Sequence, residues 1–134
     1  MNVLVTGGAG FIGSHVCAQL ALQGHGVTVL DDFNDYYDPG IKRANVEALG
    51  SGVVLREGDI RNARFVQEVM AEGKFDSIIH LAARAGVRPS LLDPMLYIET
   101  NIVGTQNLLE AAHKNGVSRF VFASSSSVYG LAKV

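Results

Sequence analysis

Short runs of apolar, often β-branched residues alternate along the chain with longer stretches in which apolar residues recur at helical spacing. The short runs predict strands, and the longer stretches predict helices that bury one face. Strands are expected at residues 2–6, 26–31, 52–59, 75–82 and 119–125. Helices are expected in the intervening segments, at residues 11–24, 39–49, 62–72 and 93–116.

Residues suited to helix ends stand at these boundaries. Asn62 can cap the third helix, and Asp93 followed by Pro94 is typical of a helix start. Gly24 and Gly116 can end helices, because glycine readily adopts the left-handed conformation that closes the last turn.

Several of the predicted strands are continuous apolar runs, with no alternation of polar residues. Strands of this kind are covered on both faces, as in a parallel sheet between two layers of helices. Right-handed crossovers then favour an α/β fold, a Rossmann-like doubly wound parallel sheet. The 134 residues are interpreted as one domain, without repeats, linkers or low-complexity segments.

The composition excludes several classes of partner. The chain is 48% apolar and 18% charged with a net charge of -2, which gives no electrostatic basis for binding nucleic acid or an anionic membrane. Cys17 is its only cysteine, so an internal disulfide is excluded and a reducing compartment fits. The N-terminus does not resemble a signal peptide, and no apolar run approaches a membrane span of about 20 residues. We therefore expect a cytoplasmic protein.

The segment VTGGAGFIGSH places Gly7, Gly10 and Gly13 between the first strand and the first helix. In this context the three glycines predict a dinucleotide site. Gly7 permits the tight turn, Gly10 lets a pyrophosphate approach the backbone, and Gly13 lets the helix lie close to the sheet. The free amides and partial positive charge at the helix N-terminus favour phosphate binding.

Asp31 ends the second strand, about twenty positions after the glycines, where a carboxylate can accept both ribose hydroxyls of an adenosine. Because it would repel a 2′-phosphate, NAD is favoured over NADP as the cofactor. No metal is expected. The segment DDFNDYYD lacks the glycine and distal glutamate of a calcium loop, and the histidines show no ligand spacing.

These residues together resemble the extended short-chain dehydrogenase/reductase family, and within it the nucleotide-sugar epimerases. The segments MNVLVTGGAGFIGSHVCAQL and GHGVTVLDD are similar to the opening of UDP-galactose 4-epimerases. The segments DDFNDYYDP, GDIRNA, HLAARAGVRPS and FVFASSSSVYG are more similar still to UDP-glucuronate 4-epimerases. The resemblance covers essentially the whole chain.

The resemblance implies a set of cofactor contacts beyond the glycines. Phe11 and Ile12 would belong to the pyrophosphate turn, and the adenosine ribose would be held by Asp31, Asp32 and Asn34. Asp59 and Ile60 would flank the adenine, with Asp59 accepting from its amino group. The exit of the fourth strand, along the cofactor, would be lined by Leu81, Ala82, Ala83 and Arg84. Asn101 would support the fourth-strand loop from the following helix. Two assignments have alternatives: many relatives carry asparagine in place of Asp32, and packing at a strand end explains residues 81–83 equally well.

The resemblance also implies substrate contacts for a UDP-sugar. Ser125 would hydrogen-bond the sugar oxygen that is oxidised, while Ser126, Ser127 and Arg88 would hold a sugar carboxylate. The implied reaction is C4 epimerisation of UDP-glucuronate through the 4-keto sugar. UDP-glucose 4-epimerases and nucleotide-sugar dehydratases are the alternatives, although dehydratases have Asp-Glu where this chain has two serines. A serine-rich strand end without a substrate role also stays open.

Tyr129 and Lys133 have the Tyr-x-x-x-Lys spacing of catalytic pairs in this family. Such a pair needs one helical face, and Gly130 with so few following residues predicts no stable helix. The pair is interpreted as a coincidence, because the resemblance implies a catalytic tyrosine and lysine on a later helix. We therefore expect residues 1–134 to be the N-terminal portion of an NAD-binding Rossmann domain, truncated after about the fifth strand and inactive alone. The open edge of that strand predicts a homo-oligomer through strand pairing.

Overall fold

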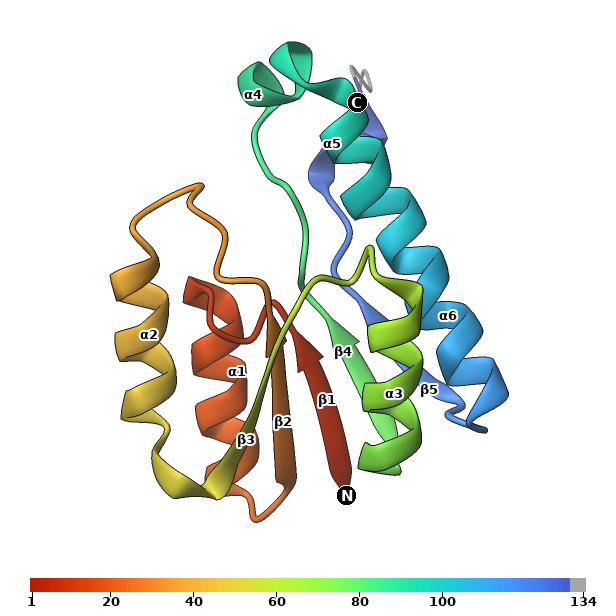
Figure 1. The fold of residues 1–134 in the computed structure, drawn as a ribbon. Coiled ribbons are helices and arrows are strands. Elements are labelled where there is room, and N and C mark those ends of the chain that lie inside the picture. The colour runs from red at the N-terminus through yellow and green to blue at the C-terminus, as the bar shows by residue number, and fades with distance from the viewer. Residues whose placement is uncertain (131–134) are drawn as a thin grey trace.

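The computed structural model describes residues 1–130, which form a five-stranded sheet flanked by helices (Figure 1). The strand order is β3-β2-β1-β4-β5, and every neighbouring pair is parallel. The strands are β1 Asn2–Thr6, β2 Gly26–Asp31, β3 Val53–Glu57, β4 Ser77–His80 and β5 Arg119–Phe122. The order reverses beside β1, as in doubly wound sheets, so the predicted Rossmann-like class is confirmed.

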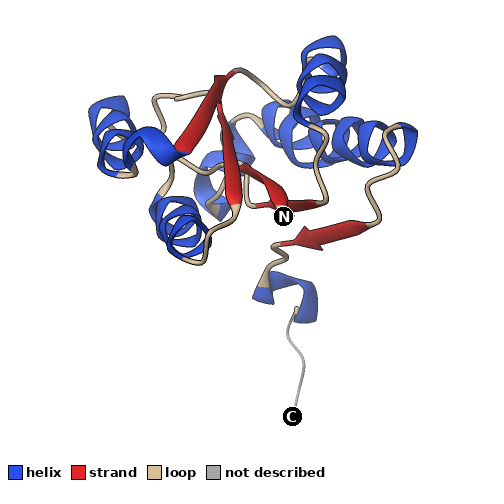
Figure 2. Cartoon of the chain, turned by 90° about the horizontal axis from the view of Figure 1, so that it is seen from below, coloured by secondary structure: helices blue, strands red, loops and turns tan. Residues whose placement is uncertain are grey.

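Helices connect the strands and cover both faces of the sheet (Figure 2). The α-helices are α1 Phe11–Leu22, α2 Pro39–Ala48, α3 Ala63–Gly73, α4 Val87–Leu92, α5 Pro94–Ile98 and α6 Thr105–Lys114. A π-helical segment, Glu99–Gly104, joins α5 to α6. The predicted caps are confirmed, since the Asn62 and Asp93 side chains accept hydrogen bonds from amides in the first turns of α3 and α5. None of the helices within residues 1–130 is long and apolar enough to cross a membrane.

The core consists of two apolar layers on opposite faces of the sheet, because successive strand side chains point to opposite sides. Val3 and Val5 of β1 pack with Cys17 of α1 on one face. Leu4, between them in sequence, packs on the other face with residues of α3 and α6 such as Val66 and Leu108. The central strand is thus buried on both sides, as its unbroken apolar run predicts.

Three expectations need correction. The helix predicted at 93–116 is divided into α5, the π-helical segment and α6, and the short helix α4 was not predicted. The last three strands are shorter than expected. The outer strands β3 and β5 are also largely exposed, with Val54 at 58% and Phe122 at 54%. Within residues 1–130 these two strands stand at the edges of the sheet, and their apolar composition did not imply coverage on both faces.

The glycine turn after β1 is packed more tightly than its sequence shows. Gly7 has φ +69°, and a Cβ placed there would lie 2.7 Å from the backbone nitrogen of Ala82, in the loop that follows β4. A Cβ on Gly13 would lie 2.1 Å from the carbonyl oxygen of Gly7. Gly13 therefore permits close packing of α1 against the glycine turn itself, whereas the sequence predicted close packing against the sheet.

The variants Gly7→Ala and Gly116→Ala separate this backbone contact from the cost of the left-handed conformation. Gly116 has almost the same φ, +71°, but nothing within 4 Å of an added Cβ. We expect Gly116→Ala to lower the free energy of unfolding by about 1 kcal/mol. Gly7→Ala should lower it by about 1–3 kcal/mol more, because Ala82 must move. Urea denaturation measures both losses; equal losses would contradict the close approach.

Candidate functional site

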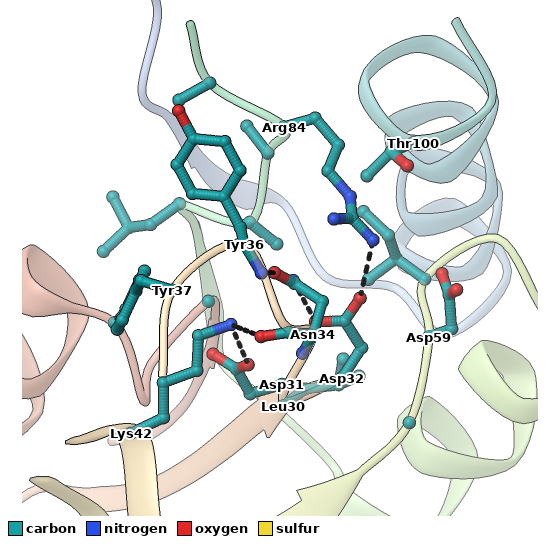
Figure 3. A pocket seen from close by; sticks show the side chains of 18 residues that line it. Leu30, Asp31, Asp32, Asn34, Tyr36, Tyr37, Lys42, Asp59, Arg84 and Thr100 are labelled. Atoms are coloured by element: carbon teal, nitrogen blue, oxygen red, sulfur yellow. Dashed lines mark hydrogen bonds and ion pairs between the residues drawn. The ribbon is translucent and has the colours of Figure 1, made fainter. Parts of the chain in front are cut away.

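A cavity of about 220 Å³ opens at the carboxyl ends of the central strands (Figure 3). The glycine turn, the end of β2, and the loops after β3 and β4 form its wall. Most of the residues predicted from sequence to contact a dinucleotide line it, namely Gly7, Gly10, Asp31, Asp32, Asn34, Asp59, Ile60, Leu81, Ala82, Ala83 and Arg84. In parallel α/β sheets this edge, where the strand order reverses, is the usual ligand site.

The N-terminus of α1 points its free amides toward this edge. Gly10 precedes the helix in an extended conformation, and no side chain caps it. The first backbone bond of the helix runs from the Ser14 amide to the Gly10 carbonyl at 2.9 Å, so the amides of Phe11, Ile12 and Gly13 precede it. These groups and the helix dipole can hold a phosphate without any charged side chain.

Asp31 lies buried at the end of β2, and its carboxylate is already partly engaged. It accepts hydrogen bonds from the amides of Ala9 at 3.1 Å and Phe33 at 3.0 Å. The Lys42 ammonium lies 3.8 Å from the same carboxylate and donates to the Asn34 carbonyl at 3.1 Å. Burial raises the pKa of Asp31, and the two amides and Lys42 counteract this effect only in part. The ribose-binding acid predicted from sequence is therefore one half of a buried ion pair.

The acidic loop after β2 is a series of side-chain-to-backbone turns. Asp32 accepts from the amide of Asn34 at 3.1 Å, and Asn34 accepts from the amide of Tyr36 at 3.2 Å. Short polar side chains commonly form such turns two residues along. Phe33 between them has φ +47°, an uncommon conformation for an aromatic residue. The turns bring Asp32 and Asn34 to the cavity while the Phe33 side chain enters the core.

Asp59 supplies a second acidic group to the wall, after β3. Its carboxylate accepts from the Arg61 amide at 2.8 Å and from the Arg61 Nε at 2.7 Å. Although partial burial acts to raise the pKa of Asp59, the hydrogen bonds from Arg61 lower it overall. Asp59 is therefore ionised at neutral pH, and it can accept a hydrogen bond from a ligand amino group.

The loop after β4 is held by Asn101, which does not itself line the cavity. Its side-chain oxygen accepts from the Arg84 amide at 2.8 Å, and its side-chain nitrogen donates to the Arg84 carbonyl at 3.0 Å. This geometry agrees with the supporting position predicted for Asn101. The Arg84 guanidinium reaches over the cavity to within 3.8 Å of Asp32 (Figure 3).

Two buried polar atoms of the cavity wall, the Arg84 Nε and the Thr100 hydroxyl, have no hydrogen-bond partner among residues 1–130. Thr100 is only 7% exposed. An unsatisfied buried polar group costs about 1–3 kcal/mol, so native proteins rarely keep one without a function. A ligand with hydrogen-bond acceptors at this end of the cavity could satisfy both donors, and a dinucleotide base has such acceptors.

Sequence reasoning missed seven further residues of the wall: Leu30, Tyr36, Tyr37, Lys42, Gly58, Ala85 and Thr100. A signal for Lys42 was available, because it stands at i, i+4 and i+7 spacing with Val46 and Leu49, which face the core. Its ammonium lies 5.1 Å from the centre of the Tyr37 ring. The positions of the two tyrosines depend on the path of the loop, for which the sequence offered no signal.

The other predicted residues do not line the cavity. Phe11 and Ile12 open α1 with side chains exposed at 76% and 65%, and neither residue lines the cavity. The predicted substrate and catalytic residues Arg88, Ser125, Ser126 and Ser127 are exposed, the first in α4 and the others after β5. Tyr129 lies in a short 3₁₀ turn, Ser126–Tyr129, while Lys133 lies outside the described residues. Within residues 1–130 no three His, Cys, Asp or Glu side chains are grouped so as to hold a metal ion.

The fold and site define a dinucleotide-binding α/β protein, and comparison with known proteins identifies its family. Residues 3–134 match the model of the NAD dependent epimerase/dehydratase family. The chain belongs to this family. UDP-glucuronate 4-epimerase 3 from Arabidopsis thaliana is 50% identical over 132 residues, which are 97% of this chain and 31% of that relative. Protein CapI from Staphylococcus aureus is 39% identical over 131 residues, 97% of this chain and 39% of CapI.

Solved structures agree with this assignment. UDP-glucose-4-epimerase from Stenotrophomonas maltophila, with bound NAD and formylated UDP-arabinopyranose, superposes with a TM-score of 0.88 at 40% identity. The match covers all of this chain and 40% of that one. The Thermus thermophilus UDP-glucose 4-epimerase complex with NAD has a TM-score of 0.83 at 42% identity, over 93% of this chain and 38% of that one. The chain thus spans about a third of the length of the first curated relative that it matches.

The variant Thr100→Val tests whether the buried hydroxyl is reserved for a ligand. Because valine has the same shape and no polar atom, we expect the ligand-free variant to gain about 1 kcal/mol of unfolding free energy. Thr105→Val is the matched control, since the Thr105 hydroxyl donates to the Asn101 carbonyl at 2.7 Å and also lies 2.9 Å from the His80 Nε2, and its loss should destabilise the chain by about 1–3 kcal/mol. Thermal and urea denaturation measure both. A destabilised Thr100→Val variant would show that its hydroxyl has a structural partner.

Proposed function

We propose that this chain binds NAD across the cavity and forms the cofactor-binding part of a nucleotide-sugar 4-epimerase that acts on UDP-glucuronate. The observation that carries the proposal is the arrangement of the wall: a glycine turn with free amides, an acid at the end of β2, and a second acid after β3. The family match and the NAD bound in similar solved structures support the same cofactor.

The adenosine half of NAD fits the charged end of the cavity. Asp59 would accept from the adenine amino group beside the buried side chain of Ile60. Asp31 would accept from the ribose hydroxyls, for which its carboxylate oxygens retain free lone pairs. The Lys42 ammonium lies beside the same carboxylate and would donate to a ribose oxygen. The Asp31 carboxylate would repel a phosphate on the ribose 2′-oxygen, although the neighbouring Lys42 ammonium weakens this repulsion.

The pyrophosphate would lie over the glycine turn. A Cβ on Gly10 would lie 3.2 Å from the Gly7 carbonyl oxygen, a tight contact, so glycine leaves room here for a close approach to the backbone. The amides of the first helical turn would hold the phosphate oxygens. Tyr37 lies across the opening, with its hydroxyl 3.9 Å from the same Cβ position, and could donate a further hydrogen bond. The nicotinamide half would then continue along residues 81–84, where Leu81, Ala82 and Ala83 give the wall a mainly apolar surface.

When bound in the cavity, NAD would supply the hydride acceptor for oxidation at C4 of the sugar and the hydride donor for reduction from the opposite face, while the C4 hydroxyl proton would pass to an acid–base pair and return from it. Ser125 follows β5 and would hydrogen-bond the C4 oxygen as it is oxidised. Ser126 and Ser127 would hold the sugar carboxylate with Arg88 as the positive charge. These four residues come from two segments, α4 and the turn after β5, that follow neighbouring strands of the sheet. The acid–base pair that completes such a reaction is not assigned to residues 1–130.

UDP-glucose is the second candidate substrate, because several similar solved structures are UDP-glucose 4-epimerases. The higher identity to UDP-glucuronate 4-epimerases, 47–50% for six of them from Arabidopsis thaliana, favours the charged sugar. The serine cluster and Arg88 favour it as well, because neutral sugars need no counter-charge.

Self-association through the exposed edge of β5 stays a prediction, supported by the exposure of Val121 and Phe122.

Calorimetric titration with NAD tests the cofactor assignment. Asp31→Asn should weaken NAD binding by about tenfold or more, because hydrogen bonds to a charged acceptor contribute about 1.5–3 kcal/mol. Asp35→Asn is the matched control, since Asp35 is an exposed acid of the same loop that does not line the cavity, and it should bind NAD as the parent chain does. Absence of NAD binding to the parent chain at millimolar concentration would refute the assignment.

The substrate assignment is tested in the longer epimerase of which we propose this chain to be the cofactor-binding part. We expect turnover of UDP-glucuronate to exceed that of UDP-glucose. The double variant Ser126→Ala, Ser127→Ala should raise KM for UDP-glucuronate by about tenfold, the loss expected when a carboxylate loses its hydrogen-bond donors. NAD binding should not change, because neither serine lines the cofactor cavity. A preference for UDP-glucose, or an unchanged KM, would overturn the assignment to the uronate.

A further inference from the structure

His80 ends β4 and immediately precedes the loop, residues 81–84, that lines the proposed cofactor cavity. Its side chain does not face the cavity. It is 1% exposed, and Phe120 and Phe122 of β5 lie against its ring with centroids 6.0 Å and 5.6 Å away. A buried histidine needs partners for both ring nitrogens. Both partners are present, and they come from different elements.

The hydrogen bonds of the Thr105 hydroxyl determine which nitrogen of the His80 ring carries the proton. The Thr105 hydroxyl lies 2.7 Å from the Asn101 carbonyl oxygen, and because a carbonyl only accepts, the hydroxyl must donate its proton there. The same hydroxyl lies 2.9 Å from the His80 Nε2. Having no second proton, it can only accept from the ring. The Nε2 of His80 therefore carries a hydrogen.

The direction of the hydrogen bond between Thr6 and His80 follows from the charge of the ring. Burial lowers the pKa of His80 to about 4, and no charged group offsets this, since the side chains that face the ring are Thr6, Thr105, Phe120 and Phe122. The ring is thus neutral, and its Nδ1 accepts. The Thr6 hydroxyl, 2.6 Å away, donates to the Nδ1. The Thr6 oxygen is then free to accept from the amide of Ala82 at 3.3 Å.

We propose that His80 is a positioning residue for the cofactor loop, which it holds as a neutral ring protonated on Nε2. The chain of bonds runs in one direction, from the Ala82 amide through Thr6, His80 and Thr105 to the Asn101 carbonyl. The Asn101 side chain in turn binds the amide and carbonyl of Arg84. One proton arrangement therefore connects both ends of the loop 82–84 to the body of the fold. Its effect on NAD binding rests on the function proposed above.

The opposite proton arrangement leaves the loop less firmly held. If Nδ1 carried the hydrogen, the Thr6 oxygen would accept from both the ring and Ala82, and its own proton would be left without an acceptor in a buried place. The Thr105 hydroxyl would also face an unprotonated Nε2 while donating to Asn101. Both changes leave buried groups unsatisfied, which is costly. The tautomer and the loop position are therefore coupled.

Nitrogen-15 NMR of the ring reads the tautomer directly. In the parent chain we expect a protonated Nε2 and an unprotonated Nδ1, unchanged from pH 8 down to pH 5 because the pKa is about 4. The Ala82 amide should exchange slowly with solvent. A protonated Nδ1, or a doubly protonated ring within this range, would overturn the proposal whether or not NAD binds.

Thr105→Val supplies the decisive variant, because it removes the acceptor of the Nε2 proton while keeping the shape of the side chain. We expect the ring proton to move to Nδ1, which leaves the Thr6 hydroxyl without an acceptor for its own proton. The rate of Ala82 amide exchange and the Kd for NAD should then each rise about tenfold, which corresponds to the loss of about one buried hydrogen bond. Thr105→Ser restores the hydroxyl and should restore all three. His113→Gln is the control, since His113 is an exposed histidine of α6.

Two results in Thr105→Val would contradict the positioning function: a ring proton that stays on Nε2, or an unchanged Ala82 amide after the proton has moved. If the parent chain does not bind NAD, the proposed function fails. The nitrogen shifts and the amide exchange still decide separately whether His80 holds the loop.

Discussion

The backbone of Gly7 lies against the backbone of Leu81 and Ala82, and the geometry of the whole site depends on this approach. A Cβ at Gly7 would stand 2.7 Å from the Ala82 nitrogen, so the two loops can meet only through glycine. The contact exists because β1 and β4 are parallel neighbours whose carboxyl ends reach the same edge. It brings the phosphate-binding turn and the loop along the cofactor into one wall.

Charge in the cavity is balanced in pairs. Lys42 lies 3.8 Å from Asp31, and Arg84 lies at the same distance from Asp32. A buried carboxylate without such a partner is costly. Besides its cation, the buried Asp31 has two backbone amides and the half-buried Asp32 has one. The pairs hold the acids in place before a ligand arrives, and this preorganisation lowers the cost of binding. The unpartnered donors of Arg84 and Thr100 are the part of the wall that a ligand would complete.

Most of the sheet could be predicted from sequence because its signals are local. The bounds of β1 and β2 agree with the predicted strands, and the caps at Asn62 and Asp93 lie where the sequence placed them. The π-helical segment Glu99–Gly104 was not predicted, since such segments are rare and α-helical spacing does not indicate them. The exposure of β3 and β5 was not predicted either, because an apolar strand has the same sequence pattern at the edge of a sheet as in its centre.

By itself the sequence determined the order of strands and helices, the glycine turn, the acid at position 31 and the family, all of which depend on residues close together in the chain. Only the tertiary structure decided two sets of partners: Lys42 with Asp31, and His80 between Thr6 and Thr105. These pairs join residues up to 74 positions apart. Which distant groups meet, and which nitrogen of a buried ring keeps its proton, depends on packing that no local pattern records.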